Sequence, residues 1–169
     1  METKPITLRP LHLEDQGQML EILTSNLVNK TYMLPDFETS EAAIPLFNRL
    51  MMLSNDTQRF VRCIALDDTA IGFLNDVEIK DGFIELGYVI HPAYHNRGFM
   101  TAALNTAIKE LFRLGYQTVH CGAFKENAAS IRVMEKAGMV RISKTEDIEY
   151  RGKLRHCVFY EKRNEEALC

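Results

Sequence analysis

Short stretches rich in hydrophobic residues recur along the chain between turn residues, and each predicts a β-strand. The first, at 6–9, is ended by Pro10. Further strands are expected at 59–66, 70–79, 83–90, 117–123, 139–147 and 154–162. Because short turns join the three strands within 59–90, this part of the chain is predicted to form an antiparallel meander.

Apolar residues at helical spacing predict four helices between these strands. They are expected near 13–23, 40–53, 98–114 and 127–138. Asn127 suits the N-cap of the last helix, and Gly115 and Gly138 suit the ends of the last two. Pro45 falls near the first turns of the second helix, so the pattern does not fix where that helix begins. The predicted order of elements is therefore βααβββαβαββ.

This order indicates an α+β fold in which helices pack on a mostly antiparallel sheet. Residues 83–123 add one strand-loop-helix-strand crossover in the middle, so the sheet is expected to be mixed. A chain of 169 residues favours a single domain, 1–169, with a substantial core. We expect the tail, 164–169, to fray.

The formal net charge of −3 weighs against a groove for nucleic acid, which needs a basic face. No apolar run approaches the ~18 residues of a membrane span. The first ten residues lack the basic-then-apolar layout of a signal peptide. We therefore expect a cytoplasmic protein that binds neither nucleic acid nor membrane.

The cysteine and histidine pattern indicates neither a disulfide framework nor a metal site. No CxxC spacing occurs among Cys63, Cys121, Cys157 and Cys169, so we expect reduced thiols. Cys121 is expected to be a buried strand thiol and no nucleophile, because no base is paired with it. His91 and His95 have the spacing of helical metal ligands, but Pro92 places them in a loop. A polar contact within the loop is the better expectation for His95.

The segment 91–101, His-Pro-Ala-Tyr-His-Asn-Arg-Gly-Phe-Met-Thr, leads from a strand into a long helix. The first N–H groups of a helix lack internal partners and favour anions. Gly98 allows close approach of the backbone, Arg97 adds a positive charge, and Thr101 adds a hydroxyl group. Together they predict a diphosphate cradle. The alternative is an ordinary turn in which Gly98 only supplies a positive φ. A Rossmann loop does not fit, because it would follow the first strand.

Two blocks of sequence resemble the GNAT N-acetyltransferases. Residues 84–92, Ile-Glu-Leu-Gly-Tyr-Val-Ile-His-Pro, followed by 94–101 resemble the acyl-CoA-binding core. Asn-Ala-Ala-Ser at 127–130, with Met-Glu-Lys-Ala-Gly-Met at 134–139, resembles the next helix in the branch of the RimJ and RimL ribosomal-protein N-terminal acetyltransferases. The opening Leu-Arg-Pro at 8–10 and the closing hairpin also fit, so the resemblance covers nearly the whole chain.

The resemblance implies a GNAT-like domain whose central sheet is splayed in the middle, with helices on both faces. Acetyl-CoA would be the co-substrate, its pantetheine arm pairing with backbone groups of Val89 and Ile90. The diphosphate would be held by Asn96, Arg97, Gly98, Phe99, Met100 and Thr101, and Asn127 would also contact the coenzyme. The family's loop pattern is Gln/Arg-x-x-Gly-x-Gly/Ala. This chain has His95 in its first position and the larger Met100 in its third.

Glu85 is our candidate for the base that takes a proton from the amine, directly or through water. It interrupts an apolar strand and, by alternation, shares a face with Gly87 and Val89. A carboxylate among buried neighbours has a raised pKa, which suits proton transfer. The alternative is a solvated residue on a half-exposed strand.

A second catalytic candidate, Ser130, comes from the resemblance. Many family members have an acidic tyrosine where this chain has Met134, which has no proton to donate. The RimL-like branch instead has a serine at the position of Ser130, proposed to protonate the CoA thiolate. Orienting a water is an equal alternative, and an ordinary residue in the first helical turn is another.

The acceptor side is less defined. The resemblance places Tyr32, Met33 and Phe37 in the wall of the acceptor site, and simple loop packing is the alternative. We predict transfer of acetyl from acetyl-CoA to a primary amine, a peptide N-terminus or a small molecule, by direct attack in a ternary complex without metal. The other hypotheses are an idle acyl-CoA-binding or regulatory module and a structural partner protein. Family members often dimerise, so a homodimer is also considered.

Overall fold

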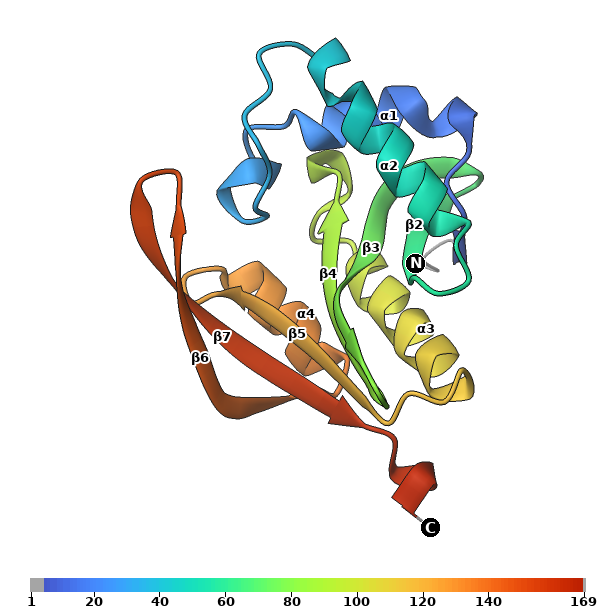
Figure 1. Ribbon diagram of the computed structural model, residues 1–169, viewed down its shortest axis with the longest axis vertical. Helices are drawn as coiled ribbons and strands as arrows, with labels where there is room; N and C mark the ends of the chain where they lie inside the picture. Colours follow the sequence, from blue (N-terminus) through green and yellow to red (C-terminus); the bar gives the residue numbers. More distant parts are fainter. Residues whose placement is uncertain (1–4, 169) are drawn as a thin grey trace. The chain divides into compact units, whose positions relative to one another are not determined.

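The computed structural model describes residues 5–168, which contain seven β-strands and four α-helices. The strands are β1 (Ile6–Arg9), β2 (Val61–Leu66), β3 (Thr69–Lys80), β4 (Phe83–Ile90), β5 (Thr118–Phe124), β6 (Val140–Tyr150) and β7 (Lys153–Arg163). The helices are α1 (Gln16–Leu23), α2 (Ile44–Ser54), α3 (Phe99–Arg113) and α4 (Ala128–Lys136). Their order along the chain is the one that the sequence pattern predicts (Figure 1).

Hydrogen bonding arranges the strands in the order β1-β2-β3-β4-β5-β7-β6. β4 and β5 run parallel and pair from Phe83↔Thr118 to Leu86↔Cys121, as a crossover through α3 requires. The pairs β1–β2, β2–β3, β5–β7 and β6–β7 are antiparallel. The expected α+β fold with a mixed, mostly antiparallel sheet is confirmed.

Both N-terminal helices begin with a 3-10 turn that the sequence pattern does not reveal. Leu13–Asp15 precedes α1, and Glu41–Ala43 precedes α2. Pro45 is the second residue of α2, where its missing N–H costs no helical hydrogen bond. After β7 the chain forms another 3-10 turn, Glu165–Leu168, while Cys169 lies outside the described residues.

Contacts within the chain divide it into two compact units. The first comprises 1–75 and 88–103, and the second comprises 76–87 and 104–169. In the first unit α1 and α2 cover one face of β2 and β3, with Met19 and Phe47 in the same buried cluster as Cys63 and Phe73. The second unit places α4 against β5, and Met134 of that helix is fully buried.

Gly72 of β3 brings two backbones close together in the first unit. A Cβ on this residue would overlap the carbonyl oxygen of Val89 in β4. The N–H of His91, just after β4, donates to the carbonyl of Ile71 at 2.7 Å. β3 therefore holds the end of β4, at Val89 and Ile90, from one side.

The part of the chain that the structure describes contains neither a membrane-spanning helix nor a metal-binding cluster. No helix there is both long enough and apolar enough to cross a membrane. No group of three or more His, Cys, Asp or Glu side chains is placed to hold a metal ion.

Candidate active site

The loop between β4 and α3 carries the predicted diphosphate cradle in the first unit. It contains a 3-10 turn, Pro92–Tyr94, and then two residues with positive φ, Asn96 at 60° and Gly98 at 79°. Apart from Gly98 and its two chain neighbours, no described residue has an atom within 4 Å of the place where a Cβ of Gly98 would be. Gly98 is therefore required by its backbone conformation and not by packing.

The start of α3 supplies backbone donors. The N–H of Ala102 donates to the carbonyl of Gly98 at 3.1 Å, so the N–H groups of Phe99, Met100 and Thr101 precede the first helical hydrogen bond. Phe99 and Met100 are buried, with Met100 only 7% exposed. The larger side chain of Met100 therefore packs inward, and only its backbone is available to an anion at the loop surface.

Arg97 adds a fixed positive charge in front of this helix. Its guanidinium lies 5.6 Å from the ring centre of Tyr94 and 5.0 Å from that of Phe99. Cation–π contacts of this kind orient an arginine without neutralising it. Arg97 thus combines with the helix dipole to favour an anion at this end of α3.

The two loop histidines hold the loop itself. The His91 ring accepts from the N–H of Ala93 through Nδ1, and its Nε2 lies 3.0 Å from Glu21. His95 Nε2 lies 3.1 Å from the carbonyl oxygen of Ile90, the polar loop contact that the sequence suggests. These contacts fix the loop to the end of β4.

Val89 and Ile90 lie beyond Leu86, the last residue of β4 in the parallel register with β5. Both side chains are buried. Together with the following loop they form one continuous segment of the first unit, so the structure brings the expected coenzyme-binding residues of 89–101 together.

Glu85 belongs to the second unit and is partly buried. Its side chain is 13% exposed, and its Oε1 lies 3.8 Å from Nζ of Lys144. Burial raises the pKa of Glu85, and the charges of Glu78 and Glu146 add to this, whereas Lys144 and His120 act in the opposite direction. The net result is a pKa above that of an ordinary glutamate.

A polar row that the sequence does not reveal runs from Glu85 across the sheet. The register pairs Glu85 with His120 and His120 with Glu161. His120 Nε2 lies 2.6 Å from Glu161 Oε2, and the buried Nδ1 of His120 has no hydrogen-bond partner within the described chain. Polar alternation in 117–123 hints at His120, but only the register shows that the three side chains are neighbours.

Asn127 and Ser130 lie together at the start of α4, also in the second unit. Asn127 Oδ1 accepts from the N–H of Ser130 at 3.2 Å, which confirms the predicted N-cap. Ser130 is partly exposed in the first helical turn, whereas Met134 is fully buried in the core.

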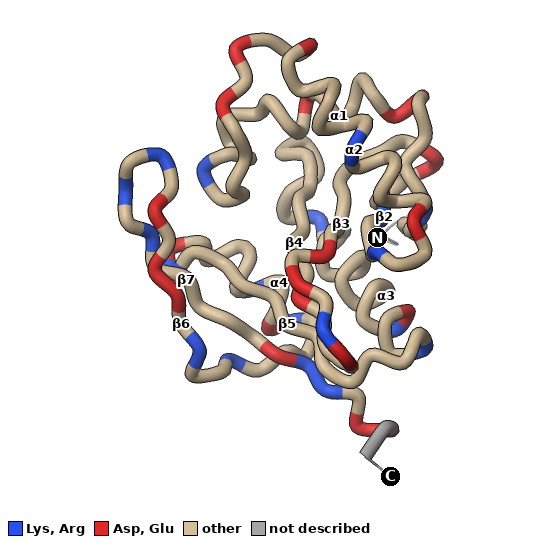
Figure 2. Tube along the Cα trace, viewed as in Figure 1, with Lys and Arg blue, Asp and Glu red and all other residues tan. Residues whose placement is uncertain are grey.

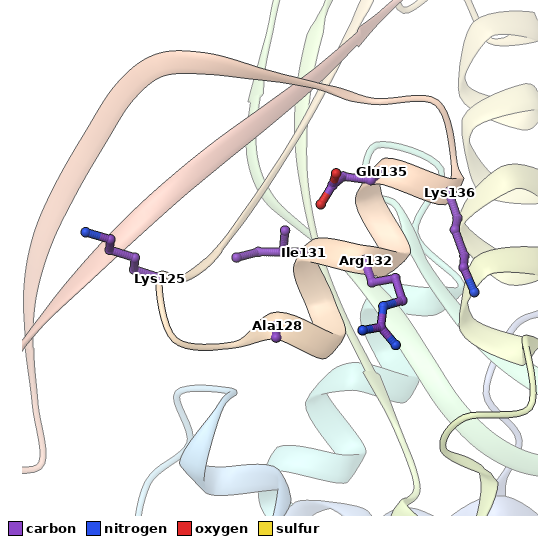
Figure 3. A pocket seen from close by; sticks show the side chains of 6 residues that line it. All are labelled: Lys125, Ala128, Ile131, Arg132, Glu135 and Lys136. Atoms are coloured by element: carbon purple, nitrogen blue, oxygen red, sulfur yellow. The ribbon is translucent and has the colours of Figure 1, made fainter.

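A shallow hollow also lies along α4. It is lined by Lys125, Ala128, Ile131, Arg132, Glu135 and Lys136. Figure 3 shows Lys125 extending from the turn before the helix and Lys136 from the far end of α4, pointing away from each other. The charged ends of Lys125 and Lys136 therefore do not meet in this hollow.

The expected acceptor residues lie between α1 and α2 in the first unit. Tyr32 donates from its hydroxyl to Asn75 Oδ1 at 2.8 Å and packs edge-on against Phe73. Phe37 is partly buried against the same core, whereas Met33 is exposed. Packing thus engages Tyr32 and Phe37 and leaves Met33 the most accessible of the three.

Three cysteines are described, and all are free and buried: Cys63, Cys121 and Cys157. Burial raises the pKa of Cys63 to about 12 and raises that of Cys121 as well. A thiol of raised pKa is a poor nucleophile at neutral pH, so burial makes Cys63 and Cys121 unsuited to nucleophilic attack. Cys169 lies outside the described residues.

Comparison with known proteins shows the family to which this chain is related. A family model described as "Acetyltransferase (GNAT) domain" matches residues 6–140. The probable N-acetyltransferase YjcK of Bacillus subtilis is 26% identical over 148 residues, which cover 82% of each chain.

Solved structures share the fold at lower identity. Spermidine N-acetyltransferase from Vibrio cholerae, in complex with CoA and spermine, has a TM-score of 0.81 and 17% identity, over 99% of this chain and all of that one. RimL, the ribosomal L7/L12 α-N-protein acetyltransferase, in complex with CoA, has a TM-score of 0.83 and 15% identity, over 95% of each chain. With the family model spanning most of its length, the chain belongs to the GNAT acetyltransferases, in their RimJ/RimL-type branch, and is an acetyl-CoA-dependent N-acetyltransferase.

Proposed function

We propose that the protein transfers acetyl from acetyl-CoA to a primary amine by direct attack in a ternary complex, the two units acting as one domain. The observation that carries this proposal is Glu85, a largely buried carboxylate of raised pKa in β4. The relatives named for spermidine and for a ribosomal-protein N-terminus support two acceptor classes, polyamines and peptide N-termini.

Glu85 meets the main chemical demand of the reaction. An amine attacks only when neutral, yet an α-amino group has a pKa near ~8 and a lysine-like amine near ~10.4. The carboxylate takes the proton of the bound ammonium, directly or through one water, and so exposes the nitrogen lone pair. A pKa above that of an ordinary glutamate makes Glu85 a stronger base for this step.

The coenzyme is assigned to the segment 89–101 and to Asn127. Backbone groups of Val89 and Ile90 pair with the pantetheine arm as an added strand would. The diphosphate is held by the N–H groups at the start of α3 and by the charge of Arg97, with Asn96, Gly98 and Thr101 completing the loop.

Departure of CoA needs a proton or a hydrogen bond on its thiolate. Ser130, held in the first turn of α4 by the Asn127 cap, is assigned this role, either itself or through a water that it orients. Met33 is the preferred acceptor contact, because Tyr32 and Phe37 are engaged in packing. The buried free cysteines support a cytoplasmic location.

The test is an acceptor panel analysed by mass spectrometry. The purified protein is incubated with acetyl-CoA and, in turn, peptides with free N-termini, polyamines and amino sugars. We expect one class to gain the mass of one acetyl group as free CoA appears in equal amount. Peptides with blocked N-termini and tertiary amines serve as matched controls. Release of CoA without an acetylated acceptor would contradict transfer to an amine.

A further inference from the structure

Lys144 places a primary amine beside the candidate base. Its Nζ lies 3.8 Å from Glu85 Oε1 and 4.3 Å from the ring centre of Phe159. The β6–β7 register shifts between Arg141 and Thr145, so Lys144 belongs to an irregular stretch of β6. Such a bulge redirects side chains, and here the Lys144 ammonium is close to both a carboxylate and an aromatic face.

Charged residues of both signs are spread over the β6–β7 hairpin (Figure 2). Lys144 differs from Lys80 in the burial of the carboxylate that it contacts. Lys80 offers a direct comparison within the same unit. Its Nζ lies 3.0 Å from Glu78 Oε1 and 5.8 Å from the ring centre of Phe83. Glu78 is 41% exposed, whereas Glu85 is 13% exposed. Lys80 therefore pairs with a solvated carboxylate, and Lys144 with a largely buried one.

We propose that Lys144 is a site of self-acetylation, its Nζ serving as an internal acceptor for the acetyl group of the bound coenzyme. This inference rests on the proposed role of Glu85. Lys144 is 43% exposed, so its side chain is not locked into the core and has room to move. The same pairing of an ammonium with a carboxylate base is what the reaction requires of an external amine.

The chemistry balances without any further reagent. The Lys144 ammonium gives one proton to Glu85, and the neutral nitrogen attacks the thioester carbonyl carbon. A C–N bond forms and the C–S bond breaks as CoA leaves. The second nitrogen proton goes to the CoA thiolate, and Glu85 returns its proton to solvent. The products are an uncharged acetyl-lysine, free CoA and one proton.

Self-acetylation also changes the site. An acetylated Lys144 carries no positive charge, so the ion pair with Glu85 is lost. The carboxylate is then free to bind the ammonium of an external acceptor in place of the lysine.

The experiment uses the full-length protein and acetyl-CoA with no acceptor, followed by peptide mass spectrometry over time. We expect acetylation of Lys144 to exceed that of Lys80 by about tenfold or more, because general-base assistance accelerates only the former. Lys80 is 66% exposed, so chemical acetylation by the coenzyme alone would modify it at least as fast. The rate per molecule should not depend on protein concentration, and Glu85→Gln should reduce Lys144 labelling to the Lys80 level.

Equal labelling of Lys144 and Lys80 in the wild-type protein would overturn the inference, whatever the variants do. A rate per molecule that rises with protein concentration would overturn self-acetylation within one chain. Acceptor-dependent CoA release is measured in parallel. If acceptors are acetylated while Lys144 stays unmodified, the inference fails and the proposed function stands; if neither is modified, both fail.

Discussion

Some charged side chains of this protein are buried, and the groups that they contact determine the direction in which their pKa shifts. In the first unit, Asp15 is buried and receives two hydrogen bonds from Arg9, at 2.8 and 2.9 Å. Burial alone would raise the pKa of Asp15, but the Arg9 hydrogen bond, the His12 N–H and the Arg9 charge together hold it below its usual value. This pair ties β1 to the turn that opens α1.

Replacing Asp15 by Asn should cost about 2–3 kcal/mol of unfolding free energy at neutral pH, because Arg9 then loses its ionic partner in a partly buried place. A folded pKa below the unfolded one contributes stability above about pH 4, which is lost as the pH falls through the folded value. Urea unfolding at a series of pH values should therefore show the gap between the two proteins closing in acid.

Glu14→Gln, in the same turn but at an exposed position, is the control and should change stability by less than about 0.5 kcal/mol. A gap between wild type and Asp15→Asn that stays constant down to acid pH would contradict the role given to this ion pair.

Glu85 leads to a prediction about pH dependence. Only its carboxylate form accepts a proton, so kcat/KM should fall as the pH drops through its raised pKa. Among the charged groups around it, Lys144 and His120 lower that pKa, and Glu78 and Glu146 raise it. Lys144→Met keeps the apolar stem and removes the charge, so it should move the acidic limb of the pH–rate profile to higher pH.

Lys80→Met is the matched control and should leave that limb in place. A limb that moves to lower pH in Lys144→Met, or equally in both variants, would contradict the electrostatic coupling of Lys144 to Glu85.

At the scale of elements, local sequence signals predict those features that depend only on contacts between residues close together in the sequence. Asn127 caps α4 because its side chain needs only the next turn of the same helix. The strand and helix order also follows from periodicity and turns. The 3-10 turn before α1 is also held locally, by the N–H of His12 donating to Asp15 Oδ2 at 2.7 Å, but apolar periodicity does not reveal such a polar contact. The row of Glu85, His120 and Glu161 depends on which strands pair and in what register, which no local pattern specifies.

The close approach of β3 and β4 at Gly72 predicts that a larger residue there disturbs both stability and CoA binding. Gly72→Ala places a methyl group against the Val89 carbonyl, so β4 must shift at the residues assigned to the pantetheine arm. We expect a fall in melting temperature and weaker binding of CoA, measured by thermal unfolding and calorimetry.

Gly17→Ala is the matched control, because α1 is helical there and no described residue outside the local helix backbone has an atom within 4 Å of the added Cβ. It should stabilise the protein by roughly 0.5–1 kcal/mol without changing CoA affinity. Normal CoA binding and stability in Gly72→Ala would show that β4 tolerates the displacement.

At the scale of the whole molecule, the resemblance of two sequence blocks to GNAT enzymes predicts the family, and the family match over 6–140 confirms it. The division into two compact units arises from tertiary packing, which local sequence patterns do not specify. The coenzyme segment 89–101 lies in the first unit and Glu85, Asn127 and Ser130 in the second. The coenzyme and the reaction follow from the family resemblance of the two blocks, whereas the acceptor depends on side chains outside these motifs.

The most direct measurement of the central claim compares wild type and Glu85→Gln in acceptor-dependent release of CoA, using the amine identified in the panel. If Glu85 is the base, kcat/KM falls by at least about tenfold while CoA affinity, measured by calorimetry, is unchanged. Glu149→Gln, on an exposed carboxylate of the same unit that is not among the charges acting on Glu85, should retain wild-type turnover. Turnover by Glu85→Gln equal to that of the wild type would contradict the account.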